Sequence, residues 1–250
     1  PKDLASVFER VRRFIGDLPR SRIAEGDKRL KLLERALASR KRAPGGASPL
    51  LEAEVEQARA RLFNLDPKKK KEQAAAYGRA AELYGRVSAQ EMREAPLERI
   101  VCENNQADTL HDLGQTDEVL RRVAAIRGEV AAVMAGDHDA EIKAHLQLSE
   151  AYTIGLGARV ANERGDYKKV VEEITPILDR FAAVGAPGFR RKEIDLIEFL
   201  VKAHKKLGEV DAASKLLERA RQRAAELGDK GKELQIAWNI ADNLFDSSRY

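Results

Sequence analysis

The chain has 250 residues, of which 43% are hydrophobic, 34% are charged and only 5% are aromatic. This composition, rich in Ala, Leu, Glu, Arg and Lys, favours helices and excludes a sheet-rich domain, which would need more Val, Ile, Tyr and Phe. The single Cys102 excludes an intramolecular disulfide and a cysteine-based zinc cluster, and no run of about 18 apolar residues is present to span a membrane. We therefore expect an all-α, cytoplasmic protein without a membrane partner.

The first 95 residues predict helices separated by short breaks. Apolar residues recur every three or four positions from residue 4 to residue 15, which is the stripe that an amphipathic helix buries. Gly16, Pro19 and Gly26 then interrupt the pattern. Ser48 followed by Pro49 is typical of a helix N-terminus. The expected helices cover residues 4–15, 29–41, 48–65 and 67–87.

The same region carries an excess of positive charge. The chain has a net charge of +4, but residues 1–71 hold 19 Lys and Arg against 10 Asp and Glu, while residues 72–250 hold 26 against 31. One interpretation is a phosphate-binding surface for a nucleic acid, and the other is a solvated helix face. We prefer the solvated face, because Phe8 and Phe14 fit the buried stripe and no exposed aromatic platform for bases is evident. The basic residues concerned are Lys68, Lys69, Lys70 and Lys71, with Arg10, Arg12, Arg13, Arg20, Arg22, Arg40, Lys41 and Arg42.

Beyond residue 95 a turn recurs along the chain. Gly114, Gly165 and Gly208 each separate a helical run rich in Ala and Leu from a second amphipathic run. Glycine suits such a corner because it adopts the left-handed conformation at little cost. Small residues such as Ala107 and Ala213 fall where paired helices would approach each other closely. The spacing predicts helix hairpins.

These features resemble the tetratricopeptide repeat family over residues 96–250. The intervals between the three glycines are 51 and 43 residues, longer than the family's period of about 34, so we expect irregular repeats with long helices or loops. The resemblance implies an α-solenoid of antiparallel helix hairpins that form a right-handed superhelix. The resemblance also divides the chain into two regions. Residues 1–95 form a basic helical region, for which degenerate repeats are one interpretation. Residues 96–250 form tetratricopeptide-like repeats, of which the last is truncated.

In this family the concave face, lined by the first helix of each repeat, binds partners. Position by position, the resemblance implies a polar groove of mixed charge with an aromatic side chain at its C-terminal end. The first segment lacks the lysine that would hold a C-terminal carboxylate, which counts against a chaperone tail as ligand. The predicted partner-binding residues are Asn104, Asn105, Asp108, His111, Arg159, Asn162, Glu198, Lys202, Lys205, Trp238, Asn239 and Asp242, and Lys206 falls at a further position of the same face.

Motifs of catalysis and of cofactor binding are absent from the sequence. It contains no phosphate-binding glycine loop, no HExxH helix and no GxSxG turn. Asp137, His138 and Asp139 could ligate a divalent metal, but acidic residues there also suit the N-cap of the helix that follows, which we prefer. The close glycines Gly155 and Gly157 lie in an expected helix, where they indicate close packing or a kink. We expect neither a cofactor nor enzymatic activity.

The function that the sequence favours is a non-catalytic scaffold that binds a protein or a peptide, including another domain of its own polypeptide. One alternative is a sensor or regulatory arm of a multidomain ATPase, protease or transcription regulator, with a role in signalling. Nucleic-acid binding through the basic N-terminal half is a further alternative and ranks last. Because the chain begins without Met and ends on Tyr250 within a periodic segment, we expect it to be part of a longer protein.

Overall fold

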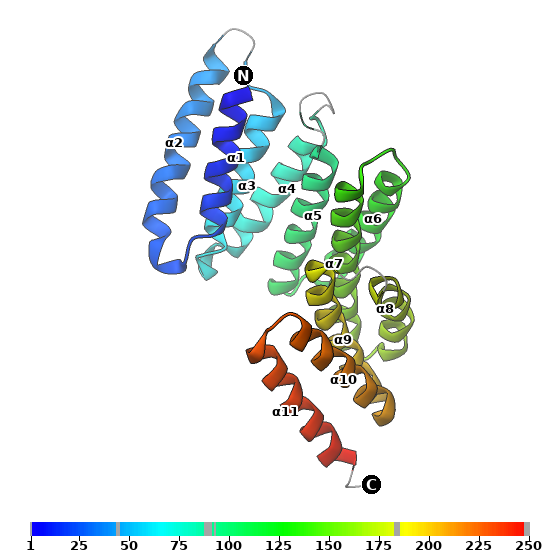
Figure 1. Cartoon of the computed structure of the whole chain (residues 1–250). Coiled ribbons are helices and arrows are strands. Elements are labelled where there is room, and N and C mark those ends of the chain that lie inside the picture. The colour runs from blue at the N-terminus through cyan, green and yellow to red at the C-terminus, as the bar shows by residue number, and fades with distance from the viewer. Residues whose placement is uncertain (1, 44–45, 88–91, 93, 183–185, 248–250) are drawn as a thin grey trace. The chain divides into compact units, whose positions relative to one another are not determined.

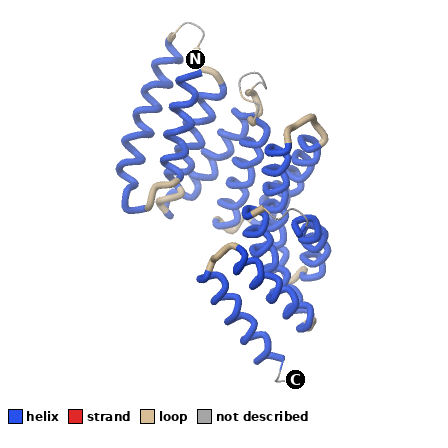
Figure 2. The backbone as a smooth tube through the Cα atoms, in the orientation of Figure 1, coloured by secondary structure: helices blue, strands red, loops and turns tan. Residues whose placement is uncertain are grey.

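A computed structural model describes the chain except residues 1, 44–45, 88–91, 93, 183–185 and 248–250, so Tyr250 lies outside the described residues. For residues 2–5, 182 and 244–247 the description covers the backbone alone. The described residues form eleven α-helices and two short 3-10 helices and contain no strand (Figures 1 and 2), which confirms the prediction of an all-α protein. The α-helices are α1 (Lys2–Gly16), α2 (Ile23–Arg42), α3 (Pro49–Phe63), α4 (Lys70–Tyr84), α5 (Ala95–Asp112), α6 (Thr116–Met134), α7 (Ala140–Arg164), α8 (Tyr167–Ala182), α9 (Pro187–Leu207), α10 (Val210–Glu226) and α11 (Lys230–Ser247).

The chain divides into two compact units, residues 1–146 and residues 147–250. The division falls within α7, whereas the boundary predicted at residues 95–96 lies at the start of α5. In the first unit, α3 packs on α1, α2 and α4, and α5 packs on α4 and α6. In the second unit, α9 packs on α8 and α10, and α10 also packs on α11. Among the described helices, none has the length and apolar character needed to cross a membrane.

The second helix begins earlier than the sequence pattern predicts. Because α2 starts at Ile23, Gly26 lies inside this helix and does not interrupt the chain, so that expectation was wrong. A Cβ atom at Gly26 would come within 2.7 Å of Leu62 Cδ1 in α3. The glycine therefore allows α2 to approach α3 closely, at a cost of about 1 kcal/mol in helix propensity. The predicted N-cap of α3 is confirmed, since the Ser48 hydroxyl accepts a hydrogen bond from the Leu51 N–H.

The three predicted glycine corners share one backbone geometry. Gly114, Gly165 and Gly208 have φ angles of +74°, +83° and +78°. In each case the glycine N–H and the N–H that follows it donate hydrogen bonds to carbonyl oxygens in the last turn of the preceding helix. This pair of bonds is the Schellman motif, which requires the left-handed conformation that glycine adopts most easily. Gly228, which the sequence pattern did not single out, forms a fourth corner of the same kind between α10 and α11.

The core of the first unit contains charged as well as apolar side chains. Arg12 of α1 is 2% exposed, and its Nε lies 2.6 Å from Glu54 Oε2 of α3. Its Nη1 lies 3.2 Å from Glu98 Oε2 of α5 and donates to Gln57 Oε1 at 2.6 Å. The Tyr84 hydroxyl of α4 is 2.9 Å from both Glu54 Oε1 and Gln57 Oε1. The expectation that Arg12 belongs to an exposed basic face was therefore wrong, because its guanidinium joins α1 to α3 and α5 inside the core.

In the second unit, α7 packs closely against α9. A Cβ atom at Gly155 would lie 3.3 Å from Leu196 Cδ2 and 3.5 Å from Phe199 Cε2, so this glycine serves close packing, as the sequence indicated. The Asn162 side chain adds a polar contact, because its Nδ2 donates to the Phe199 carbonyl oxygen at 3.1 Å. These contacts hold α9 in place, and α9 carries half of the groove described next.

Candidate binding groove

A groove between α9 and α11 brings together five of the predicted partner-binding residues. Residues 198, 202 and 205 are four and three positions apart, and residues 239 and 242 are three apart, so each set shares one face of its helix. The shared groove therefore agrees with the spacing in the sequence, while its role in binding stays a prediction. The groove has a volume of about 490 Å³ and is lined by Glu198, Val201, Lys202, Lys205, Lys206, Asn239 and Asp242.

Local sequence determines how the two helices present this face. Pro187 occupies the first turn of α9, and Gly208 ends the helix in the left-handed conformation. At the start of α11, the Asp229 carboxylate accepts a hydrogen bond from the Lys232 N–H at 3.0 Å, which caps the helix. Ile236 is 1% exposed and anchors α11 by burial. The polar groove residues consequently lie beside the buried faces of both helices.

Two ion pairs link α9 to α11 across the groove. Lys232 Nζ lies 2.6 Å from Glu198 Oε1, and Lys205 Nζ lies 3.1 Å from Asp242 Oδ2. All four side chains are between 23% and 57% exposed, so each pair contributes about 0–1 kcal/mol to stability. Sequence reasoning missed Lys232, because the long lysine side chain reaches Glu198 from the first turn of α11. The two pairs therefore neutralise charges of the groove but add little to the stability of the fold.

Lys202 and Lys206 differ from the other lysines of the groove. Both are exposed, and they lie four positions apart on one side of α9. Among the residues that the structure describes, no carboxylate forms an ion pair with either one. Their positive charges are therefore available to a ligand.

Trp238 lies beside the groove and outside its lining. Its side chain is 77% exposed, and Leu234, one turn earlier on α11, is 74% exposed. The neighbouring Asn239 lines the groove, whereas Trp238 faces solvent on an adjacent side of the helix. Trp238 is therefore exposed but does not line the groove, and its role in binding stays a prediction.

The other predicted partner-binding residues do not belong to this groove. Asn104, on α5 in the first unit, is 4% exposed and offers little surface. Asn162, on α7, is also 4% exposed and is bonded to the backbone of α9. The structure assigns both asparagines to the interior, which spacing along a helix cannot reveal. The remaining four are partly exposed, namely Asn105, Asp108 and His111 on α5 and Arg159 on α7.

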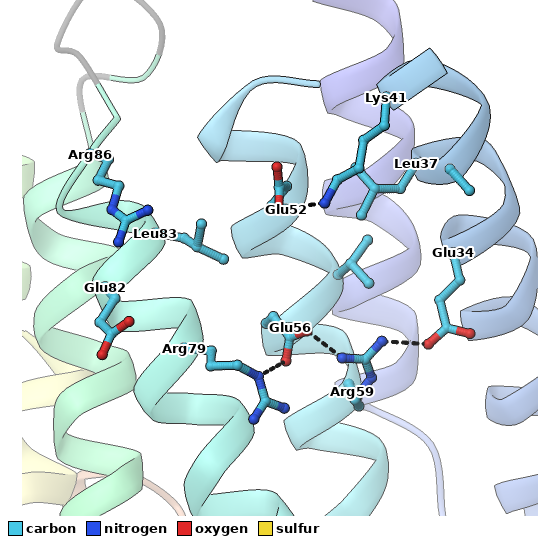
Figure 3. Close-up of a pocket in the computed structure, with 12 residues that line it drawn as sticks. Glu34, Leu37, Lys41, Glu52, Glu56, Arg59, Arg79, Glu82, Leu83 and Arg86 are labelled. Atoms are coloured by element: carbon cyan, nitrogen blue, oxygen red, sulfur yellow. Dashed lines mark hydrogen bonds and ion pairs between the residues drawn. The ribbon is translucent and has the colours of Figure 1, made fainter. Parts of the chain in front are cut away.

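A larger groove of about 640 Å³ lies in the first unit, between α2 and α4 along α3. Figure 3 shows that most of its charged side chains form ion pairs, three of which join neighbouring helices, while Glu82 and Arg86 have no partner drawn. Sequence reasoning missed this ladder, because most of the partners belong to different helices and follow no helical spacing. The pairs are Arg59 with Glu34 (2.6 Å) and with Glu56, Arg79 with Glu56 (2.8 Å), and Lys41 with Glu52 (2.7 Å).

The predicted phosphate-binding run does not form one uniform cationic surface. Lys68 and Lys69 belong to a 3-10 helix, Pro67–Lys69, and Lys70 and Lys71 begin α4. Lys69 Nζ lies 5.0 Å from the centre of the Phe63 ring, and Lys70 Nζ lies 2.8 Å from Asp112 Oδ2. Two of the four lysines thus have partners within the protein, and phosphate binding by the run stays a prediction.

Other reactive side chains have structural surroundings. The Asp139 carboxylate accepts a hydrogen bond from the Ile142 N–H at 2.9 Å, which supports its interpretation as a helix cap. In the described part of the chain, no group of three or more His, Cys, Asp and Glu is placed to hold a metal ion. Cys102 is fully buried in α5, and burial raises the pKa of its thiol well above the ordinary value. The thiol is therefore protonated and enclosed at neutral pH.

In comparisons with known proteins, the chain matches no protein-family model, no curated protein and no solved structure. The resemblance to tetratricopeptide repeats accordingly rests on the spacing of residues in the sequence.

Proposed function

We propose that this protein is a non-catalytic scaffold that binds a protein or peptide segment in the groove between α9 and α11. The observation that carries the proposal is that five residues selected from the sequence as a partner-binding face line a single groove. Two ion pairs define its walls, Val201 supplies an apolar element, and the Asn239 amide can both donate and accept hydrogen bonds. Side chains of these kinds can hold an extended backbone in one orientation.

The helices would form a tetratricopeptide-like array of antiparallel hairpins. Three observations support this part of the proposal. The corners at Gly114, Gly165 and Gly208 have the same geometry, and each joins a helix pair in which small residues such as Ala107 and Ala213 are buried. The long intervals between the corners are explained in part by long first helices, 25 residues in α7 and 21 in α9.

A binding role fits the chemistry of the groove better than a catalytic one. Its lining offers no hydroxyl or thiol that a base could activate, and its amines and carboxylates pair with one another or face solvent. A cytoplasmic setting, in signalling or as a regulatory arm of a larger polypeptide, is part of the same proposal. The single Cys102, a buried free thiol, is compatible with a reducing compartment.

The proposal is tested by filling the groove without changing its charge. Asn239→Trp places a large side chain in the lining and should exclude an extended segment. In affinity capture from cell lysate followed by quantitative mass spectrometry, the proteins retained by the wild type should be lost. Gln222→Trp, on the exposed side of α10, adds the same side chain outside the groove and should retain them. Circular dichroism should show the same helix content in all three proteins.

If Asn239→Trp retains every protein that the wild type captures, the groove is not the binding surface. Equal loss in Asn239→Trp and Gln222→Trp would point to a general effect of the added tryptophan and would also contradict the proposal.

A further inference from the structure

The groove between α9 and α11 carries more positive than negative charge. Three lysines and two carboxylates line it, and a fourth lysine, Lys232, reaches it by pairing with Glu198. The second carboxylate, Asp242, pairs with Lys205. Each carboxylate is thus compensated within the protein, while the described residues provide no carboxylate for Lys202 or Lys206. The charge that remains for a ligand is positive.

The spacing of these two lysines suits an extended peptide. Four residues of α-helix rise about 6 Å, so Lys202 and Lys206 stand about that far apart along α9. In an extended segment, side chains on the same side are two residues apart, which corresponds to about 6.6 Å. Carboxylates at alternate positions of such a segment therefore match the two ammonium groups in separation. Both lysine side chains are flexible enough to absorb the small difference.

Other groups in the groove favour a peptide over a nucleic acid, which would also supply anions. Glu198 and Asp242 can accept hydrogen bonds from the N–H groups of a peptide backbone, whereas a phosphodiester group has no donor to offer them. Base stacking would need an aromatic platform, and Trp238 lies outside the lining. The lysines alone would accept either ligand, so the carboxylates and the position of Trp238 decide between them.

On the basis of the proposed function, we infer that the groove selects an extended acidic segment whose carboxylates, at alternate positions, meet Lys202 and Lys206.

The test uses the full chain and a fluorescent peptide of alternating Glu and Ser residues, with binding followed by anisotropy. The wild type should bind this peptide, should bind an alternating Lys and Ser peptide far more weakly, and should lose affinity as salt is added. An exposed charge pair is worth up to about fivefold in affinity, and reversal also adds repulsion. Lys202→Glu with Lys206→Glu should therefore weaken binding by about tenfold or more.

A matched control separates the groove from the net charge of the protein. Lys168→Glu with Lys169→Glu makes the same change in charge at two exposed lysines of α8, outside the groove, and should alter affinity by less than about twofold. A peptide of the same composition with its Glu residues in adjacent pairs should bind more weakly than the alternating peptide, because only one carboxylate of each pair then faces α9.

The inference is wrong if the alternating Glu peptide does not bind, or if the Glu and Lys peptides bind equally well. It is also wrong if the two double lysine variants lose the same affinity for the Glu peptide. Tighter binding of a thymine oligonucleotide than of the Glu peptide, dependent on Lys202 and Lys206, would overturn it as well. Failure of the proposed function is distinguishable. If Asn239→Trp loses its cellular partners while the acidic peptide does not bind, the groove binds proteins and the inferred acidic selectivity is wrong.

Discussion

The two units of the chain use charge in different ways. In the first unit, the buried Arg12 is held by Glu54 and Glu98, and the groove along α3 is crossed by ion pairs between its own helices (Figure 3). In the second unit, the groove between α9 and α11 keeps Lys202 and Lys206 without an ion-pair partner among the described residues. Charges that are paired within the chain hold helices together, whereas charges left over indicate where a partner can bind. Among the described residues, the charges left over in the larger groove, Glu82 and Arg86, have opposite signs, whereas Lys202 and Lys206 in the smaller groove are both positive.

The largest effect on stability is expected from breaking the buried network of the first unit. Arg12→Ala leaves Glu54 in the core without its cation and should lower the free energy of unfolding by about 3–5 kcal/mol. Burial already raises the pKa of Glu54, and Arg12 opposes that rise, so removal of the guanidinium favours the protonated acid. Unfolding in urea, followed by circular dichroism, measures the loss.

The neighbouring Arg13 provides the control. It is 69% exposed and pairs with Glu9 on the surface of α1, so Arg13→Ala should cost less than about 1 kcal/mol. Arg12→Met combined with Glu54→Leu should recover part of the loss, because the Glu54 carboxylate no longer remains in the core without its cation. Equal effects of the two single arginine variants would show that Arg12 is not buried in solution.

The fold shows which structural features are local enough to be predicted. The corner glycines and the cap at Ser48 were predictable because their function depends on residues a few positions away. Gly26 was misinterpreted because its role depends on Leu62, which comes from another helix. Arg12 was misassigned for the same reason, since its acidic partners lie in α3 and α5 and no periodic pattern connects them to α1.

A smaller and pH-dependent effect is expected at another charged contact of the first unit. Arg99 Nε lies 3.0 Å from Glu129 Oε1 and 3.2 Å from Glu103 Oε1, so the two carboxyl groups share one guanidinium. Burial and the charge of Glu103 raise the pKa of Glu129 from 4.5 to about 7, against the opposing effect of Arg99. Between these two pH values the native state holds a proton that the unfolded state releases. Stability should therefore fall as pH rises through this window.

Glu129→Gln removes the titrating carboxyl group and tests whether Glu129 causes this pH dependence of stability. The variant should show a flatter dependence of the urea midpoint on pH between about 4.5 and 7 than the wild type. Glu118→Gln, on the same helix, leaves the Glu103 and Glu129 pair intact and should keep the wild-type dependence. A Glu129→Gln profile that parallels the wild type would mean that another group is responsible for the pH dependence.

For the groove between α9 and α11, the sequence could predict which residues of one helix lie on the same face. Lys202, Lys205 and Asp242 could be grouped because helical periodicity places residues three and four apart on one face. The burial of Asn104 and Asn162 could not be derived in this way, since neighbouring helices decide which face is covered. Lys232 was missed because its contact with Glu198 depends on how α11 is placed relative to α9. The sequence therefore indicated which side chains share a face, and the structure adds which of them are open to solvent.

The smallest effect on stability is expected from Trp238→Ala, in spite of the size of the side chain. Trp238 is 77% exposed, so its truncation should change the free energy of unfolding by less than about 0.5 kcal/mol. Ile236, two residues earlier on α11, is 1% exposed, and Ile236→Ala should cost about 2–5 kcal/mol because it leaves a cavity. Urea unfolding of both variants compares the two sides of one helix. If both variants lose the same stability, the Trp238 side chain is covered in solution. If Trp238→Ala keeps its stability but binds the acidic peptide more weakly, Trp238 belongs to the binding surface.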